Sequence, residues 1–316
     1  MSRAFNLTDA FTPAEIKAFS AKSDLWGWWA VLTTWGLIAA AFVLMALVPH
    51  VLTVVAGLIL LGGRQLALSI LMHEAAHYSL FRTRRLNDLV GKWLCAAPVW
   101  GDVARYRRHH VQHHAHTNSD LDPDLSLVTP FPTSGASLRR KFLRDLLGAT
   151  GLKRVIGLWM MDTGTLTYTV SGGAKRVRPA GGLAGRLRLG LRTMGPMLIT
   201  NGLLLAVLLG SGAGWTYLVW LGAYLTTYSL FIRIRAIAEH ACTERSDHPL
   251  RNTRTTRAGL LARLTVAPIH VNYHLEHHLM PSAAYHQLPR MHRRLRAQGA
   301  IGPAPGYLAV LRTVTA

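Results

Sequence analysis

The stretch WGWWAVLTTWGLIAAAFVLMALV, residues 26–48, contains no charged side chain and decides the kind of fold that the chain adopts. A helix that crosses the hydrocarbon core of a bilayer needs about 20 predominantly apolar residues. Residues 26–48 are therefore predicted to form a membrane-spanning helix. We expect no secretory signal peptide, because residues 1–25 are polar and this apolar run is too long for the core of such a peptide.

Further apolar segments extend this prediction along the chain. A second run begins at residue 51, directly after Pro49-His50, and a block from Met194 to Ile232 is interrupted by GSGAG at 210–214. Gly-rich and Pro-containing breaks of this kind mark turns between helices. We predict an all-α integral membrane fold with four spans in two hairpins, at about residues 26–48, 51–72, 194–210 and 214–232.

The distribution of basic residues predicts the orientation in the membrane. The chain carries 35 Lys and Arg against 15 Asp and Glu, a net charge of +20. Residues 81–193 contain 19 of the basic residues and residues 233–316 contain 12, whereas the two hairpin tips contain none. Because cytoplasmic loops are enriched in Lys and Arg, residues 73–193 and 233–316 are expected to form a cytoplasmic cap, with both termini on that side. We treat residues 1–316 as a single membrane domain.

A charge of +20 also occurs in nucleic-acid-binding proteins, but this chain contains no motif, basic helix pattern or aromatic platform for that purpose. We therefore expect no nucleic-acid partner. A basic cytoplasmic face is suited to anionic lipid headgroups or to an acidic redox protein.

Three histidine motifs carry the chemistry of the chain. HEAAH at 73–77 places two imidazoles at positions i and i+4, which lie on one face of a helix. HVQHH at 110–114 places three at i, i+3 and i+4, and HLEHH at 274–278 repeats that spacing far away in the sequence. Neither packing nor solvation explains this repetition, so we interpret the motifs as metal ligands.

The predicted topology brings these motifs to one side of the membrane. The first follows span two, the second lies in the same loop, and the third follows span four. His240 lies just after span four, in RIRAIAEH at 233–240, and is a candidate ninth ligand beside His73, His77, His110, His113, His114, His274, His277 and His278. The alternative for His240 is a helix-end histidine paired with Glu239.

The number of imidazoles exceeds the capacity of one ion, since a catalytic site keeps a coordination position open. We therefore predict two metal ions. Imidazole binds Zn, Cu, Fe and Ni alike, so ligand type does not choose among them, but a membrane site without thiolates suits O₂ chemistry on iron. Acceptors for the second ring nitrogen of the ligating histidines are expected among Glu74, Asp122, Asp124, Glu239, Asn272 and Glu276. Other histidines are read as non-ligands, namely His109, His116, His248, His270, His286 and His292.

These motifs resemble the histidine boxes of the membrane fatty-acyl desaturases. The resemblance rests on HEAAH (73–77), RRHHVQHHAHTN (107–118) followed by DPD (122–124), RIRAIAEH, and NYHLEHHLMPSAAYHQLP (272–289), in the order and with the spans of that family. It covers most of residues 60–292. It implies that the nine histidines hold a di-iron centre, which uses O₂ and two reducing equivalents to introduce a double bond into a fatty-acyl chain.

The resemblance and the sequence leave alternatives open. Related boxes occur in enzymes that hydroxylate or ketolate lipids or carotenoids, so oxygen transfer on the same centre is the nearest rival. A non-enzymatic membrane metal binder or transporter is a remote rival, because spans one, three and four lack the ionisable residues that would line a path. No cytochrome, flavin or nicotinamide motif occurs in the chain, so electrons are expected from a separate ferredoxin-like or cytochrome-like donor.

Overall fold

The computed structural model of this chain describes residues 6–178, 181–246 and 248–316, and within these residues the fold is helical without a β-strand. The only strand-like pairings among them are two isolated bridges, one joining Leu166 to Arg176 and the other joining Arg257 to Gly306. The prediction of an all-α fold is therefore confirmed.

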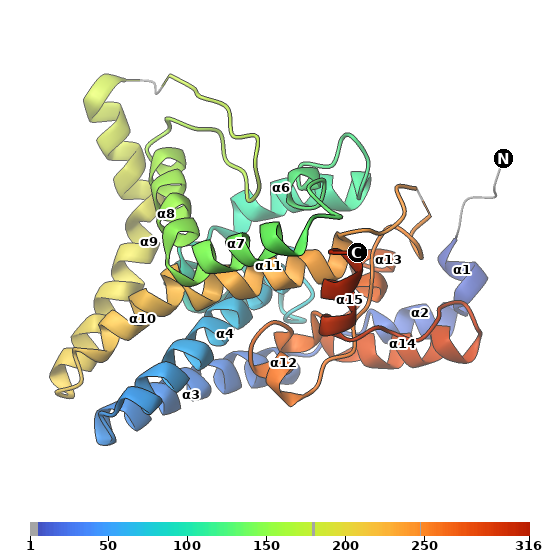
Figure 1. Cartoon of the computed structure of the whole chain (residues 1–316), viewed down its shortest axis with the longest axis horizontal. Helices are drawn as coiled ribbons and strands as arrows, with labels where there is room; N and C mark the ends of the chain where they lie inside the picture. The colour runs from blue at the N-terminus through green and yellow to red at the C-terminus, as the bar shows by residue number, and fades with distance from the viewer. Residues whose placement is uncertain (1–5, 179–180, 247) are drawn as a thin grey trace.

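The helices follow one another through short connections (Figure 1). The N-terminal part contains α1 (Leu7–Ala10), α2 (Pro13–Phe19), α3 (Asp24–Leu47) and α4 (Val51–Ala76). The middle part contains α5 (Arg84–Val90), η1 (Gly91–Ala96), η2 (Ala97–Val99), α6 (Val103–His116), η3 (Leu125–Leu127), α7 (Gly135–Leu146), α8 (Ala149–Asp162) and α9 (Gly182–Gly210). The C-terminal part contains α10 (Thr216–Leu225), α11 (Thr227–His240), α12 (Leu260–Leu264), η4 (Pro268–His270), α13 (His274–Leu279), η5 (Tyr285–Gln287), α14 (Leu288–Ala297) and α15 (Tyr307–Thr313).

Within the described residues, three helices are long and apolar enough to cross a membrane, namely α3, α4 and α9. They cover the first three predicted spans, except that α3 ends at Leu47, one residue before the predicted end. Helix α9 begins at Gly182, well before residue 194. The fourth predicted span, 214–232, is divided between α10 and α11 at Thr226, whose φ of −109° and ψ of −87° are not helical. The prediction of four spans is therefore not confirmed by helix length.

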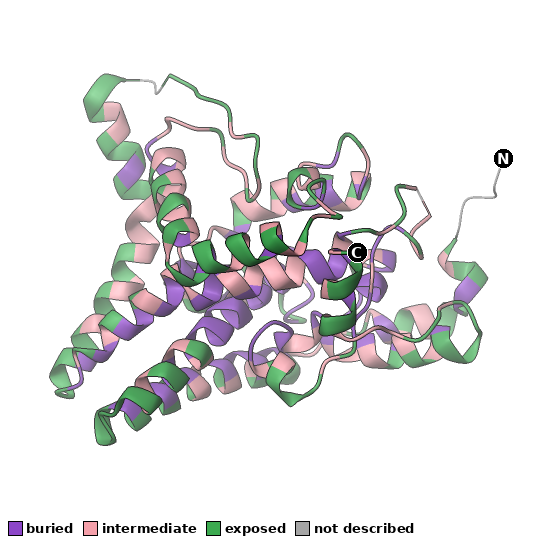
Figure 2. Cartoon of the chain, in the orientation of Figure 1, coloured by how far each residue is buried: buried purple, intermediate pink, exposed green. Residues whose placement is uncertain are grey.

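Helix α4 is the central element of the fold. It packs against α3, α6, α10 and α11, and nearly all of its residues from Leu61 to Ala76 are buried. Its first half instead exposes apolar side chains such as Leu52, which is 70% exposed. Figure 2 shows the same exposure along the projecting ends of α3 and α9. Apolar surface of this extent is expected where a helix contacts lipid.

Two adjacent glycines let other segments approach the α4 backbone closely. A Cβ atom at Gly62 would lie 2.1 Å from the hydroxyl oxygen of Thr227, and one at Gly63 would lie 2.0 Å from the carbonyl oxygen of Leu264. Only glycine permits these contacts. Because of these contacts, the start of α11 and the end of α12 pack directly on α4. The helix that carries His240 therefore lies against the helix that carries His73.

The N-terminal segment packs against the helices around the third histidine motif. Phe11 and Phe19 pack with Leu279, Met291 and Leu295 of α13 and α14 in a separate apolar cluster. Because this cluster lies directly under α13, the N-terminal segment supports the third histidine motif.

Candidate metal centre

The first histidine motif lies at the end of α4. His73 is buried within the last turn and His77 caps the helix C-terminus. Arg107 of α6 donates from Nε to the carbonyl oxygen of Ala76 at 2.8 Å and from a terminal nitrogen to that of Ala75 at 3.3 Å. A cation here adds hydrogen-bond donors to the last carbonyls of α4 and complements the helix dipole. Arg107 thereby ties the first motif to the helix that carries the second.

The second motif lies on α6, as its spacing predicts. The side chain of Asp102 caps this helix by accepting a hydrogen bond from the backbone N–H of Arg105 at 2.8 Å. His110 and His113 are buried, and His114 is half-buried. The third motif forms α13, a helix of 6 residues, and His240 is the last residue of α11.

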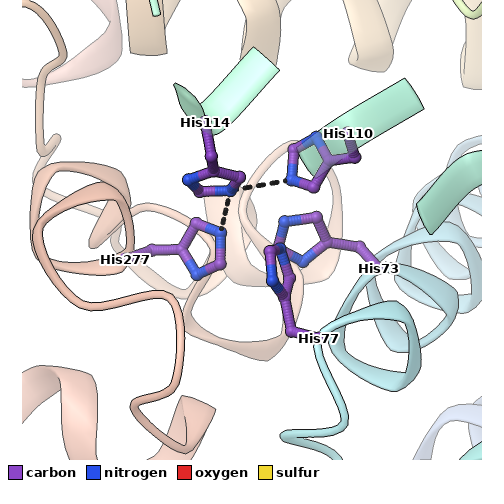
Figure 3. Close-up of side chains that lie close together, drawn as sticks. All are labelled: His73, His77, His110, His114 and His277. Carbon is purple, nitrogen blue, oxygen red and sulfur yellow. Dashed lines mark hydrogen bonds between the residues drawn. The ribbon is translucent and has the colours of Figure 1, made fainter. Parts of the chain in front are cut away.

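All nine histidines predicted from the sequence converge, and they fall into two groups. Within each group one nitrogen of every ring lies within 4.8 Å of those of the others. Figure 3 shows the larger group, in which rings from α4, its C-terminus, α6 and α13 point toward a common centre. The larger group contains His73, His77, His110, His114 and His277, and the smaller contains His113, His240, His274 and His278.

The division follows helix geometry. Residues at i and i+4 lie nearly one above the other, whereas the residue at i+3 is rotated to the other side of that line. His110 and His114 accordingly share the larger group, while His113 joins the smaller. In the third motif His274 and His278 share the smaller group, while His277 joins the larger. Each HxxHH motif therefore contributes to both groups and fixes them side by side.

The ring nitrogens are spaced as ligands of a common ion would be. The Nε2 atom of His114 lies 3.0 Å from that of His110 and 3.1 Å from that of His277. In the smaller group, the Nε2 atoms of His274 and His240 are 2.8 Å apart. If two imidazole nitrogens bind one metal ion at about 2.1 Å each, with a right angle between the two bonds, they lie roughly 3 Å apart. The residues present therefore fit two metal ions.

Buried ring nitrogens without a hydrogen-bond partner give a second test of the fit. They occur on seven of the nine histidines, namely His73, His77, His110, His114, His274, His277 and His278. Unsatisfied polar atoms at this density are costly in a protein interior and require an explanation. Metal ions would satisfy the Nε2 atoms of His73, His77 and His278. On His110, His114, His274 and His277 the atom without a partner is Nδ1, whereas their Nε2 atoms are the closely spaced nitrogens described above.

Several hydrogen bonds orient the rings from outside. The Nδ1 of His73 lies 3.0 Å from Oε1 of Glu74, whose other oxygen accepts from the hydroxyl of Ser79 at 2.8 Å. The Nδ1 of His113 lies 2.8 Å from Oδ1 of Asp122. Such contacts fix the tautomer, leaving the opposite ring nitrogen free for a metal.

Asp122 is itself held in the ionised form. Burial raises the pKa of this carboxyl, but the hydrogen bond and charge of His113 and the backbone N–H groups of Asn118 and Asp124 outweigh it. The pKa of Asp122 is therefore below its usual range. An ionised Asp122 is the stronger acceptor for His113.

Other expected acceptors behave differently. Glu239 lies 3.6 Å from Nδ1 of His274 and mainly accepts from Arg235 at 2.7 Å. Asp124 binds His109 at 2.7 Å and lies 3.9 Å from His113. Two further expectations are wrong, because Glu276 contacts Thr255 and His292 instead, and the side-chain amide of Asn272 donates to the carbonyl of Thr256.

Glu276 points away from the ligands for a geometric reason. It follows His274 by two residues, which places it on the opposite face of α13. Thr117, whose hydroxyl lies 3.1 Å from Nδ1 of His278, is a further partner of the ligand rings that the sequence does not predict. These two residues are 161 positions apart, and no sequence pattern connects them.

Burial favours the neutral form of most of the imidazoles. It lowers the pKa of His77 to about 4, assisted by the nearby charges of Arg107 and other groups. It also holds the pKa values of His110, His114, His274, His277 and His278 well below the usual range. A neutral ring has a lone pair available for a metal at neutral pH.

A cavity of about 710 Å³ borders the two groups. His110, His113, His240 and His274 line one part of it, and apolar residues of α4, α8 and α11 line much of the rest. The ring of Tyr106 stacks on His110 beside the cavity, with 4.9 Å between ring centroids. A substrate in this cavity would lie directly against the histidines.

Membrane-length helices and buried, histidine-only groups suited to two metal ions define a class of membrane metalloprotein. Within that class, the chain belongs to the fatty acid desaturase family, whose sequence model matches residues 49–305. It is also similar to the dihydrorhizobitoxine desaturase of Bradyrhizobium elkanii. The two are 25% identical over 273 residues, which cover 80% of this chain and 68% of that protein.

Proposed function

We propose that the chain is a membrane oxidoreductase in which nine histidines hold two iron ions, and that it introduces a double bond into a fatty-acyl chain. The observation that carries this proposal is the convergence of nine imidazoles from separate helices into groups of five and four. Iron at these positions would supply the activation of O₂ and the removal of hydrogen. The word desaturase in the relative's name supports double-bond formation over transfer of oxygen to the product.

The residues of the chain would then hold the metal ions, place the acyl chain beside them and exclude water. The larger group would hold one ion and the smaller group the other, while Asp122, Glu74 and Thr117 would orient their rings. The cavity would place the acyl chain against the histidines and keep water away from it. Two electrons would come from a separate acidic donor of the ferredoxin or cytochrome type, attracted by the basic cap.

We further propose that α10 and α11 together form the fourth crossing, which would place both termini and the histidines on the cytoplasmic side. Both helices pack along α4, and the basic residues are concentrated in the cap. Cysteines introduced as Ser211→Cys and Ala297→Cys, in a variant with Cys95 and Cys242 replaced by serine, test this topology. An impermeant maleimide should label position 211 from outside intact cells and position 297 only after permeabilisation. Labelling of both from one side would refute the four-span arrangement.

Mass spectrometry of lipids from aerobic cells tests the reaction. Cells would express the wild type or His277→Ala together with a ferredoxin system, and His116→Ala is a matched control because His116 lies outside both groups. We expect an unsaturated product with the wild type and the control but not with His277→Ala. A product heavier by one oxygen would show hydroxylation instead of desaturation. If the wild type and His277→Ala gave identical lipid profiles and the purified wild type contained no iron, the proposed function would be refuted.

A further inference from the structure

The cavity beside the histidines extends away from them to a polar end on α8. Thr150, Lys153 and Arg154 of α8 line this end. Ser229 of α11 also lines the cavity and lies next to Arg154, whereas His240 lies at the other end of the same helix. Ser229 and His240 are eleven positions apart, which corresponds to roughly 16 Å of helical rise. The α8 end is therefore remote from the metal groups but belongs to the same cavity.

Arg154 is held rigidly at this end. One terminal nitrogen donates to the hydroxyl of Ser229 at 3.1 Å, and the other donates to the carbonyl oxygen of Tyr224 at 2.5 Å. The guanidinium also lies over the rings of Tyr224 and Tyr228, at 4.5 and 4.6 Å from their centroids. Stacking of this kind fixes the plane of an arginine and pre-organises its donors.

The guanidinium is under-satisfied despite these contacts. It has five N–H donors, of which the two contacts above use two. Its Nε is buried without a hydrogen-bond partner. Among the described residues, no carboxylate oxygen lies within 4.0 Å of Arg154. A half-buried cation without a counter-ion is unfavourable, because the charge has lost part of its hydration.

The other arginines of the cavity are different. Arg233 forms a paired contact with both carboxylate oxygens of Asp145, and Arg235 binds Glu239 at 2.7 Å. Both are neutralised inside the protein. Unlike Arg233 and Arg235, Arg154 has no carboxylate partner among the described residues.

Other groups on the same part of α8 also favour a bound anion. Lys153 is the neighbouring residue and also lines the cavity. Thr150, one turn earlier on α8, has a buried hydroxyl without a partner, and the N-terminus of α8 has no side-chain cap. The first N–H groups of a helix carry a partial positive charge that favours an anion nearby. Independent features of α8 therefore attract negative charge to one place.

We propose that the α8 end of the cavity is an anion-binding subsite, in which Arg154 and Lys153 hold an ionised carboxylate or phosphate at the end of the substrate. The substrate is then an amphiphile with a charged head and an extended chain, and its head lies far from the carbon that reacts. A neutral lipid or hydrocarbon leaves Arg154 without a counter-ion. This inference rests on the proposed function for the reaction at the histidines. The subsite itself can be tested by ligand binding, without the reaction.

Equilibrium binding of radiolabelled probes to the full chain in lipid nanodiscs tests the subsite. The probes are dodecanoate, methyl dodecanoate and dodecyl phosphate, and the proteins are the wild type, Arg154→Gln, Arg154→Lys and the control Arg144→Gln. Arg144 is exposed on α7 and does not line the cavity. We expect the wild type and the control to bind dodecanoate about tenfold more tightly than its methyl ester, as one charge-assisted hydrogen bond would give.

Arg154→Gln should remove this preference, and Arg154→Lys should retain part of it, because lysine keeps the charge but loses the planar fork. Tighter binding of dodecyl phosphate than of dodecanoate would assign the head to a phosphate, and the reverse would assign it to a carboxylate. Equal binding of dodecanoate and its ester by the wild type would overturn the proposal, even if Arg154→Gln fails to fold. The iron content of the same samples reports separately on the proposed function, since a chain without iron can still discriminate between the probes.

Discussion

The Nε2 atom of His240 lies 2.8 Å from the Nε2 atom of His274, although the two residues belong to different helices. His240 is outside the three repeated motifs, and its ring lies 4.9 Å from that of His113 and 5.2 Å from that of His278. It therefore completes the smaller group of four. Without it, that group retains three imidazoles, whereas the larger group keeps all five.

Replacement of His240 should consequently affect one metal position. We predict that His240→Ala lowers the iron content from about two ions per chain to about one, because three imidazoles bind an ion less tightly than four. Inductively coupled plasma mass spectrometry of purified protein measures this directly, with His116→Ala as the control. Retention of both ions by His240→Ala would show that His240 is a hydrogen-bonded helix-end histidine instead of a ligand.

Asp122 should matter for metal affinity although it binds no metal itself. Loss of the carboxylate in Asp122→Asn removes the acceptor that orients His113, and changes of this kind cost about 10- to 100-fold in metal affinity. A competition titration with an iron chelator measures the effect. Asp120→Asn is the matched control, because Asp120 is 91% exposed and forms an ion pair with Arg245 on the surface. Equal chelator resistance in both variants would exclude this role for Asp122.

Arg107 should stabilise the contact between the first and second motifs. Arg107→Gln leaves the last carbonyls of α4 without their cationic partner, and we expect a loss of about 1–2 kcal/mol of unfolding free energy. Thermal unfolding in detergent should show a lower Tm than in Arg108→Gln, which alters an exposed neighbour. An unchanged Tm would mean that the α4 terminus is adequately solvated without Arg107.

The metal-free protein should lose stability on mild acidification. Since the pKa of His77 in the folded chain is about 4 and its ordinary value is 6.5, the unfolded chain binds more protons between these values. This contribution to stability is complete above pH 6.5 and is lost progressively as the pH falls toward 4. The Tm of metal-free protein should therefore be lower at pH 5.5 than at pH 7.5, and His77→Gln should reduce the difference. A Tm that is the same at both pH values would show that the rings are not buried in the neutral form.

The sequence was sufficient to predict that nine histidines converge, but not how they divide into two groups. HxxHH spacing places three rings on one broad helical face, and the parity of the spans places His240 with them. Which rings share a group depends on how α6 and α13 lie against each other. That arrangement is determined by contacts such as Thr117 with His278, which join residues far apart in the chain.

The fold was predicted well where long apolar runs determine it, and less well near residue 226. Nothing in Thr226-Thr227 resembles a glycine or proline break, yet the helix is interrupted there. At this interruption, the carbonyl oxygen of Tyr224 accepts a hydrogen bond from Arg154, a residue of a different helix. A tertiary contact of this kind cannot be derived from the apolar pattern of the segment itself.

Crystals of the aerobically purified protein, with X-ray data collected on both sides of the iron absorption edge, give the most direct test of the central claim. We predict two anomalous peaks per chain at the iron edge, one among His73, His77, His110, His114 and His277 and the other among His113, His240, His274 and His278. A single peak, peaks that appear only at the zinc edge, or metal bound elsewhere would contradict the assignment of these histidines to a di-iron centre.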